Sequence, residues 1–244
     1  MRFFEAIIAQ AKGEGGVGYN GAMIFGKIEY LNLLPLHVFL KRRLRTSAEK
    51  KAWLKRGSVP SAINRAFRSG RVDAAVISSV KSRGRRCVDF GIVADGPVQS
   101  VLLLPGSESA DAESDTSNIL AKVLGMKGEV LIGDKALVRY LRRPEGAVDL
   151  AEAWKKKEGL PFVFARLCAN PRHIARVQRL ADDFFAHPPK IPYRTLAREA
   201  RRRGITVAEL RAYLGKIGYR IGWREKRALK RFLQLARRTS RNPL

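Results

Sequence analysis

The chain has 244 residues, 45% of them hydrophobic, which is enough to bury a core in one large domain or in two lobes. No apolar run approaches the roughly 20 residues of a membrane-spanning helix. Two distant cysteines and three scattered histidines make no disulfide framework and no zinc-ligand spacing. We therefore expect a protein of a reducing compartment, without a metal site and without membrane association.

The charge is strongly positive, with 48 Lys and Arg against 22 Asp and Glu and a formal net charge of +26. Such a charge attracts anions, and nucleic acid is one interpretation. Residues 190–244 carry 17 basic and three acidic residues, mostly opposite an apolar stripe, with few aromatic residues interleaved. We favour a solvated basic surface over a specific nucleic-acid site and leave non-specific nucleic-acid binding open.

The first 22 residues differ from the rest of the chain. A short apolar patch interrupted by Glu5 is followed by a glycine-rich stretch, which does not match a secretory signal. We interpret residues 1–22 as an N-terminal extension whose order is left open. The first convincing strand runs from Met23 to Ile28.

From residue 60 onward, hydrophobic spacing predicts alternating helices and strands. The predicted elements are a helix over 61–68, a strand over 72–77, a strand over 98–104, a helix from Ser114 or Asp115 to Gly125, a strand over 129–132, a helix capped by Asp134, and a strand over 160–167. This alternation is typical of an α/β fold with a largely parallel sheet.

The last third of the chain is predicted to be helical. Asn170 and Pro171 form a cap followed by proline at the first helical position, and Thr206 begins a capping box. The final amphipathic helix has its apolar stripe near Leu229 and Phe232.

Small polar residues gather at the predicted ends of strands and starts of helices. These candidate site residues are Tyr30 and Asn32, Ser78 and Ser79, Gln99 and Ser100, Thr116, Ser117 and Asn118, and Gly133 and Asp134. Ligands of open α/β sheets bind beyond the carboxyl ends of strands, and a helix start offers free N–H groups to a carboxylate or phosphate. Taken singly, each segment also fits an ordinary cap or turn.

Together, the segments resemble the chorismate dehydratase family of the futalosine route to menaquinone. The matching pieces follow the family's order and span nearly all of the chain from Met23 onward. They are Gly26–Pro35, Ala75–Ser79, Val98–Val101, Asp115–Asn118, Ile132–Asp134, Asp149–Trp154 and Gly159–Ala165. Two departures are Lys81, where many relatives have an acidic residue, and the basic excess with its N-terminal extension.

The resemblance implies a two-lobed α/β fold like type II periplasmic binding proteins, used in the cytoplasm as an enzyme without a cofactor. Lobe one would comprise residues 23–99 and 164–244, and lobe two residues 100–163, with the ligand cleft between them. The implied reaction is the dehydration of chorismate to 3-[(1-carboxyvinyl)oxy]benzoate.

The same resemblance implies the roles of the candidate residues. Asn32 and Ser79 would be catalytic and hold the substrate's conformation, while the other candidates would bind its carboxylates and hydroxyl. The base is either the enolpyruvyl carboxylate of the substrate, which we favour, or Asp134.

Alternative functions remain at this point. A related 1,4-dihydroxy-6-naphthoate synthase would use a histidine in lobe two, but no histidine occurs between His37 and His173. A non-catalytic protein that binds a small anion would share the fold. We interpret the three histidines as structural or surface groups and Cys168 as a core residue.

Overall fold

The structure, a computed structural model, describes residues 23–44, 47, 49–50, 53 and 57–241. The extension assigned to residues 1–22 lies outside them. None of the described helices combines the length and the apolar character needed to cross a lipid bilayer.

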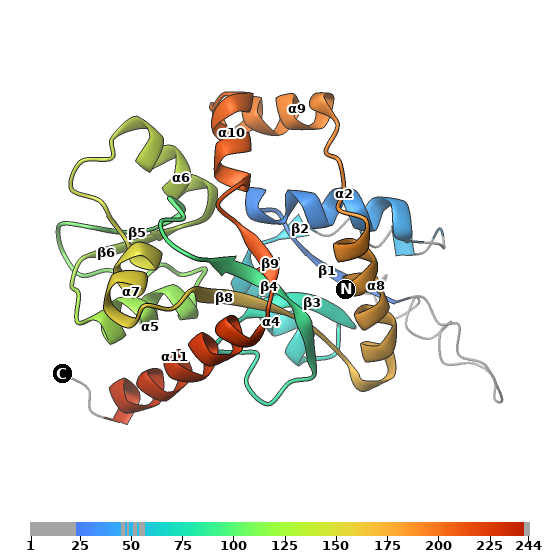
Figure 1. Ribbon diagram of the computed structural model, residues 1–244, viewed down its shortest axis with the longest axis horizontal. Helices are drawn as coiled ribbons and strands as arrows, with labels where there is room; N and C mark the ends of the chain where they lie inside the picture. The colour runs from blue at the N-terminus through green and yellow to red at the C-terminus, as the bar shows by residue number, and fades with distance from the viewer. Residues whose placement is uncertain (1–22, 45–46, 48, 51–52, 54–56, 242–244) are drawn as a thin grey trace, which may run out of the picture.

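The described strands form two sheets (Figure 1). The first contains β1 (Phe25–Ile28), β2 (Gly57–Ser58), β3 (Ala74–Ser78), β4 (Cys87–Ala94), β8 (Phe162–Ala169) and β9 (Gly218–Arg220), in the order β2-β1-β3-β8-β4-β9. The second contains β5 (Val101–Leu104), β6 (Glu129–Ile132) and β7 (Val148–Asp149), in the order β6-β5-β7. The chain therefore leaves the first sheet after β4 and returns to it as β8.

The strand directions correct the prediction of a largely parallel sheet, which was wrong. β1 pairs in parallel with β2 and β3, but β8 runs antiparallel to β3 and β4, and β9 antiparallel to β4. The second sheet is antiparallel throughout. β2, β4, β7 and β9 were not predicted, and β8 enters the sheet between two strands that precede it by many residues.

The described helices cover the edges and faces of the sheets. They are η1 (Leu31–Leu33), α2 (Leu34–Arg43), α4 (Pro60–Arg68), α5 (Asp115–Leu124), α6 (Gly133–Arg142), α7 (Leu150–Glu158), η2 (Pro171–His173), α8 (Ile174–Ala186), α9 (Tyr193–Arg203), α10 (Val207–Leu214) and α11 (Trp223–Arg241). α4 packs against β1 and β3, and α8 packs against β4 and β8. α11 contacts both β8 and α5, so it joins the two sheets (Figure 1).

Most of the predicted elements are confirmed with shifted ends. α5 is capped by the Ser114 side chain and ends at Gly125 in the left-handed region, and Thr206 forms the predicted capping box at α10. The helix cap assigned to Asp134 is wrong, because α6 begins at Gly133 and Ile132 is its N-cap residue. The strand predicted from Val98 begins only at Val101, since the preceding residues form the crossing between the sheets.

An aromatic cluster joins the elements that meet where β8 enters the sheet. Trp154 of α7 packs edge-on against Phe162 of β8 and Phe232 of α11. The Trp154 indole N–H also donates to the Pro161 carbonyl at 3.1 Å. The cluster fixes the return of the chain to the first sheet, because large aromatic contacts contribute strongly to packing.

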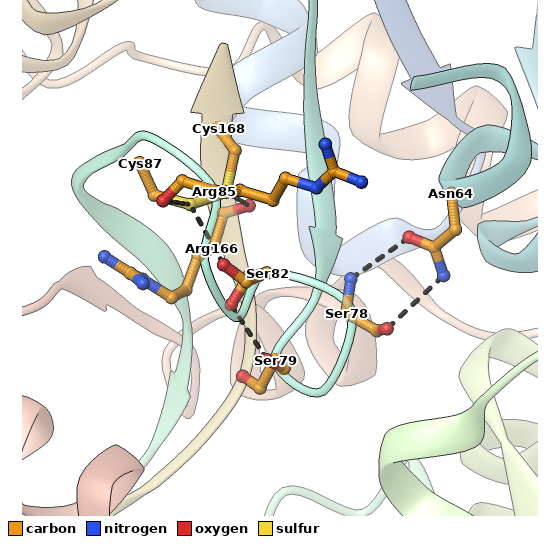
Figure 2. The surroundings of a disulfide bond; sticks show 8 residues. All are labelled: Asn64, Ser78, Ser79, Ser82, Arg85, Cys87, Arg166 and Cys168. Atoms are coloured by element: carbon orange, nitrogen blue, oxygen red, sulfur yellow. Dashed lines mark hydrogen bonds between the residues drawn. A yellow bond between two sulfur atoms is a disulfide. The ribbon is translucent and has the colours of Figure 1, made fainter. Parts of the chain in front are cut away.

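Cys87 and Cys168 form a disulfide, which corrects the expectation of none (Figure 2). They are 81 residues apart in the chain but lie directly opposite each other in the β4–β8 register. Spacing along the chain could not reveal this pairing because it depends on β8 entering beside β4. Cys168 is buried, as expected for a core residue.

Candidate active site

A narrow cavity of about 70 Å³ lies between the two sheets. Its walls are mostly apolar and come from η1, β3, β4, β5, β6 and β8, with Phe164 and Ile92 among them. Its polar lining residues are Tyr30, Asn32, Ser78, Ser100, Ser114 and Ser117. An apolar cavity with a few polar groups is typical of a small-molecule site.

Asn32 lines the cavity and carries a hydrogen-bond acceptor that the described residues do not satisfy. Its side-chain Oδ1 is buried and has no hydrogen-bond partner. Its backbone carbonyl accepts a bond of 2.7 Å from the Tyr219 hydroxyl, which holds η1 in place. Buried polar atoms are rarely left unpaired, so Asn32 Oδ1 indicates the position of a ligand donor.

Ser78 ends β3 and is held from behind by Asn64 of α4 (Figure 2). Asn64 Oδ1 accepts from the Ser78 backbone N–H at 3.2 Å, and Asn64 Nδ2 donates to Ser78 Oγ at 3.3 Å. The hydroxyl hydrogen of Ser78 is therefore available to a ligand in the cavity. Asn64 was not predicted as a site residue. The feature that could have indicated it is a polar amide next to Ile63, among the buried residues of α4.

The N-terminus of α5 faces the same cavity from the second sheet. Ser114 Oγ accepts from the Ser117 backbone N–H at 3.1 Å and lies 2.9 Å from Ser117 Oγ, to which it donates. This leaves the Ser117 hydroxyl hydrogen free to donate into the cavity. Together with the positive end of the helix dipole, this arrangement favours an anion.

Tyr30 and Gly133 pack against each other at one side of the cavity. A Cβ at Gly133 would lie 2.6 Å from Cζ of Tyr30, so only glycine fits here. The Tyr30 hydroxyl donates to Glu113, and both burial and this bond raise the pKa of the phenol. Tyr30 therefore stays neutral. Glu113 was not predicted, because it lies 83 residues away in a loop without a recognisable pattern.

Ser100 and Gln99 lie at the crossing from β4 to β5. Ser100 lines the cavity, and its hydroxyl hydrogen-bonds with the buried Tyr213 hydroxyl at 3.0 Å. Gln99 does not line the cavity, and its φ of 64° is in the left-handed region that disfavours side chains. Asp149 Oδ2 holds this backbone by accepting the N–H groups of Val98 and Gln99 at 2.8 and 2.6 Å.

Three other predicted residues lie beside the cavity without lining it. Ser79 is fully buried and its hydroxyl donates to the Val163 carbonyl at 2.5 Å, so its side chain is not presented to a ligand. Thr116 Oγ1 accepts from the Val80 N–H at 3.3 Å, which joins α5 to the loop after β3. Asn118 holds the backbone of Asp111 through both its amide atoms.

Asp134 also lies outside the cavity lining. Its Oδ1 accepts from the Leu31 N–H at 2.9 Å, and its Oδ2 accepts from Arg203 Nε at 2.8 Å. Burial raises the pKa of Asp134, although both bonds oppose the shift. Through these two bonds Asp134 holds η1 against α6 and α9.

No cluster of His, Cys, Asp and Glu suited to a metal ion occurs within the part of the chain that the structure describes. The arrangement offers hydroxyl donors from both sheets, one free acceptor and apolar walls. Such a site suits a small, largely apolar ring that carries a carboxylate and a hydroxyl.

The family model described as "Menaquinone biosynthesis" matches residues 23–129 and 125–238. The chain is 42% identical over 217 residues to a chorismate dehydratase of Campylobacter jejuni, with 87% of this chain and 96% of the relative covered. It is 28% identical over 264 residues to a chorismate dehydratase of Thermus thermophilus, with 86% and 94% covered.

Solved structures share the fold at low sequence identity. Protein AF1704 from Archaeoglobus fulgidus matches with a TM-score of 0.65 and 14% identity, covering 89% of this chain and 97% of that one. The periplasmic aliphatic sulphonate binding protein SsuA from Escherichia coli matches with a TM-score of 0.50 and 13% identity, covering 91% and 89%. The predicted α/β fold like periplasmic binding proteins is therefore confirmed.

Proposed function

The chain belongs to the menaquinone biosynthesis family, and on that premise we propose that it is a chorismate dehydratase, a hydro-lyase. It converts chorismate to 3-[(1-carboxyvinyl)oxy]benzoate and water. The 42% identity to a relative of that name over most of both chains supports the activity. The observation that carries the site assignment is the unpartnered Asn32 Oδ1 in a cavity ringed by serine hydroxyls.

The reaction breaks the C–H bond at the ring carbon that bears the ether and the C–O bond of the neighbouring hydroxyl. The electron pair of the C–H bond forms the new ring double bond, and the proton leaves with the hydroxyl as water. Negative charge that develops on the ring is conjugated with the ring carboxylate. Fixed donors on that carboxylate therefore stabilise the transition state more than the substrate.

The donors proposed for the ring carboxylate are the hydroxyls of Ser78 and Ser117, with the N-terminus of α5 behind them. Asn32 Oδ1 accepts the hydrogen of the ring hydroxyl and thereby fixes the ring's orientation. Ser79 acts through its neighbour: its bond to Val163 holds the end of β3 that presents Ser78, so it is a positioning residue.

The enolpyruvyl carboxylate of the substrate takes the ring proton and passes it to the departing hydroxyl. This assignment is supported by the position of Asp134, which does not line the cavity and whose two oxygens accept hydrogen bonds from Leu31 and Arg203. Positioning alone contributes on the order of 7–11 kcal/mol to a barrier in favourable cases, so an intramolecular base is sufficient in principle.

We take residues 23–99 with 164–244, and 100–163, as two lobes that close over the substrate. The cavity of about 70 Å³ is narrow for a substituted six-membered ring, so chorismate enters when the lobes separate. The crossings of the chain between the lobes, at Val98–Ser100 and before β8, are the positions that would absorb the motion.

The activity is tested by incubating the full chain with chorismate and following the aromatic ether by absorbance and mass. Asn32→Ala and Ser117→Ala should each lower kcat/KM on the order of 10²-fold, the usual effect of losing one fixed polar contact. Ser107→Ala, on the exposed loop after β5, is the matched control and should behave like the wild type. Binding of chorismate without any turnover by folded wild-type protein would instead identify a small-anion-binding protein.

The base is tested by Asp134→Asn, which keeps an acceptor for the Leu31 N–H but removes the charge facing Arg203. We expect kcat to fall by less than about tenfold, because the group serves positioning and not proton transfer. Loss of all turnover with unchanged chorismate binding would contradict the substrate-assisted mechanism.

A further inference from the structure

A second and larger cavity, of about 500 Å³, lies between α2 and α9. We call it the α2–α9 cavity. It shares one lining residue, Tyr30, with the cavity between the sheets. Apolar side chains of Leu34, Val38, Trp53 and Pro192 form part of its wall. A cavity of this size is typical of sites for small organic molecules.

Its charged lining is dominated by cations. Six basic side chains face two carboxylates: Lys27, Lys41, Arg42, Arg198, Arg202 and Arg203 against Glu29 and Glu199. Such an excess in a partly enclosed space concentrates the field and favours an anion.

The two carboxylates are already engaged by neighbouring cations. Glu29 pairs with Lys27 at 2.9 Å, while Glu199 lies 2.9 Å from Arg198 and 2.5 Å from Arg203. Burial raises the pKa of Glu199, but the hydrogen bonds from these two guanidinium groups outweigh it and the pKa is lowered. Glu199 is therefore ionised and neutralises only part of the guanidinium charge.

Lys41 and Arg42 remain without an ion-pair partner among the residues that the structure describes. Both side chains lie at the C-terminal end of α2, on the wall facing α9. They are exposed and can turn toward a ligand at little cost. A multiply charged anion would thus meet cations from both helices.

His37 provides an independent indication of a ligand. Its Nε2 is buried and has no hydrogen-bond partner, and its ring packs edge-on against Trp53 with centroids 5.3 Å apart. Burial, with Lys27 nearby, lowers the pKa of His37 to about 4, and the imidazole hydrogen-bonds with the Ile28 backbone. His37 lines the cavity, and its neutral ring therefore holds a buried, unsatisfied nitrogen close behind the wall.

We infer that the α2–α9 cavity is a second binding site for a small organic dianion with an apolar body. It is separate from the cavity between the sheets, where we place chorismate. The guanidinium forks and lysines suit the oxygens of a phosphate monoester or a dicarboxylate. Leu34, Val38 and Trp53 suit the apolar part, and His37 Nε2 accepts a hydrogen bond from the ligand or from a water bound with it. This inference does not depend on the proposed activity.

The test is calorimetric titration of the full chain with phenyl phosphate, phthalate and inorganic phosphate. Phenyl phosphate or phthalate should bind at least about tenfold more tightly than inorganic phosphate, since only they contact the apolar wall. The stronger of the two identifies the headgroup. Equal binding of all three would overturn the inference, because it would reflect charge alone.

Variants locate the ligand. The double variant Lys41→Gln/Arg42→Gln should weaken binding of the better probe at least about tenfold, as expected for losing two charged contacts. Arg237→Gln/Arg238→Gln removes the same charge from exposed positions on α11 and should change binding less than about twofold. A similar loss in both double variants would overturn the inference.

Two further variants separate this site from the cleft. Asn32→Ala should leave phenyl phosphate binding unchanged. Loss of binding in this variant would place the ligand in the cavity between the sheets and contradict the inference. His37→Asn keeps a hydrogen-bond donor near the Ile28 carbonyl but removes Nε2, and should weaken binding several-fold in protein whose circular dichroism matches that of the wild type.

Discussion

The buried carboxylate of Asp149 hydrogen-bonds backbone N–H groups from two separate segments. Asp149 accepts N–H groups from Val98 and Gln99 at the crossing and from Ala151 and Glu152 at the start of α7. Burial raises the pKa of Asp149, while these four bonds oppose the shift. This aspartate therefore has a structural role, which is to fix the crossing against the start of α7.

Gly133→Ala tests the contact with Tyr30. Both Gly133 and Gly146 have a φ close to +71°, but only at Gly133 would a Cβ collide with a ring. Gly146→Ala should cost about 1–2 kcal/mol of unfolding free energy from the backbone alone. Gly133→Ala should cost more and also raise the KM for chorismate, because Tyr30 must move. Denaturant unfolding and steady-state kinetics measure both effects, and equal behaviour of the two variants would contradict the role of the contact.

His37 predicts a specific dependence of stability on pH. Its folded pKa of about 4 is below the ordinary 6.5, so the unfolded chain binds the proton first as the pH falls. The unfolding free energy should therefore decrease from pH 6.5 to pH 4, by on the order of 3 kcal/mol from this group. His37→Asn should flatten that part of the profile measured by urea unfolding, and an unchanged slope would contradict the assignment.

At the level of elements, sequence patterns correctly predicted the helix caps and ends that depend on residues within one helix. α5, with its Ser114 cap and terminal Gly125, and the capping box of α10 follow from residues within one helix. β4 and β9 were missed because β4 pairs with β8, and β9 pairs with β4, in each case across a long stretch of the chain. The parallel sheet was a wrong inference from alternation, since alternation does not give the direction of a strand.

The candidate site also contains residues that the sequence predicted and residues that it did not. Asn32, Ser78 and Ser117 were predicted because small polar residues at strand ends and helix starts are visible in the sequence, and they line one cavity. Asn64, Glu113 and Tyr213 do not line that cavity but hydrogen-bond residues that do, through contacts between distant segments. Their positions follow from tertiary packing, which no short pattern encodes.

The disulfide gives a prediction for the β4–β8 pair. Cys87→Ala should lower the unfolding free energy by about 2–4 kcal/mol under non-reducing conditions. A reducing agent should bring the wild type close to the variant. The bond is checked by isolating the protein in the presence of a thiol-trapping reagent, unfolding it and counting the free thiols. Two free thiols per chain would contradict the bond. Because disulfides persist mainly in oxidising compartments, the same measurement bears on the expected cytoplasmic location.

At the scale of the whole molecule, the first sheet is discontinuous in sequence while the second is continuous. A fragment comprising residues 23–160 contains β1–β7 but lacks β8. We expect limited proteolysis of this fragment to cleave readily within β3 and β4, whose shared partner is missing, and more slowly within residues 101–149. Equal protection of both regions would show that the first sheet forms without β8.

The central position of β8 also determines the order in which a ribosome can complete the molecule. The strands of the second sheet have all been synthesised by Asp149, whereas β3 and β4 wait for residues 162–169 to fill the space between them. Until then two strands with buried, apolar sequences have unpaired edges, the feature that promotes association between chains. A pause in translation between residues 95 and 161 would therefore leave the nascent chain most prone to aggregate.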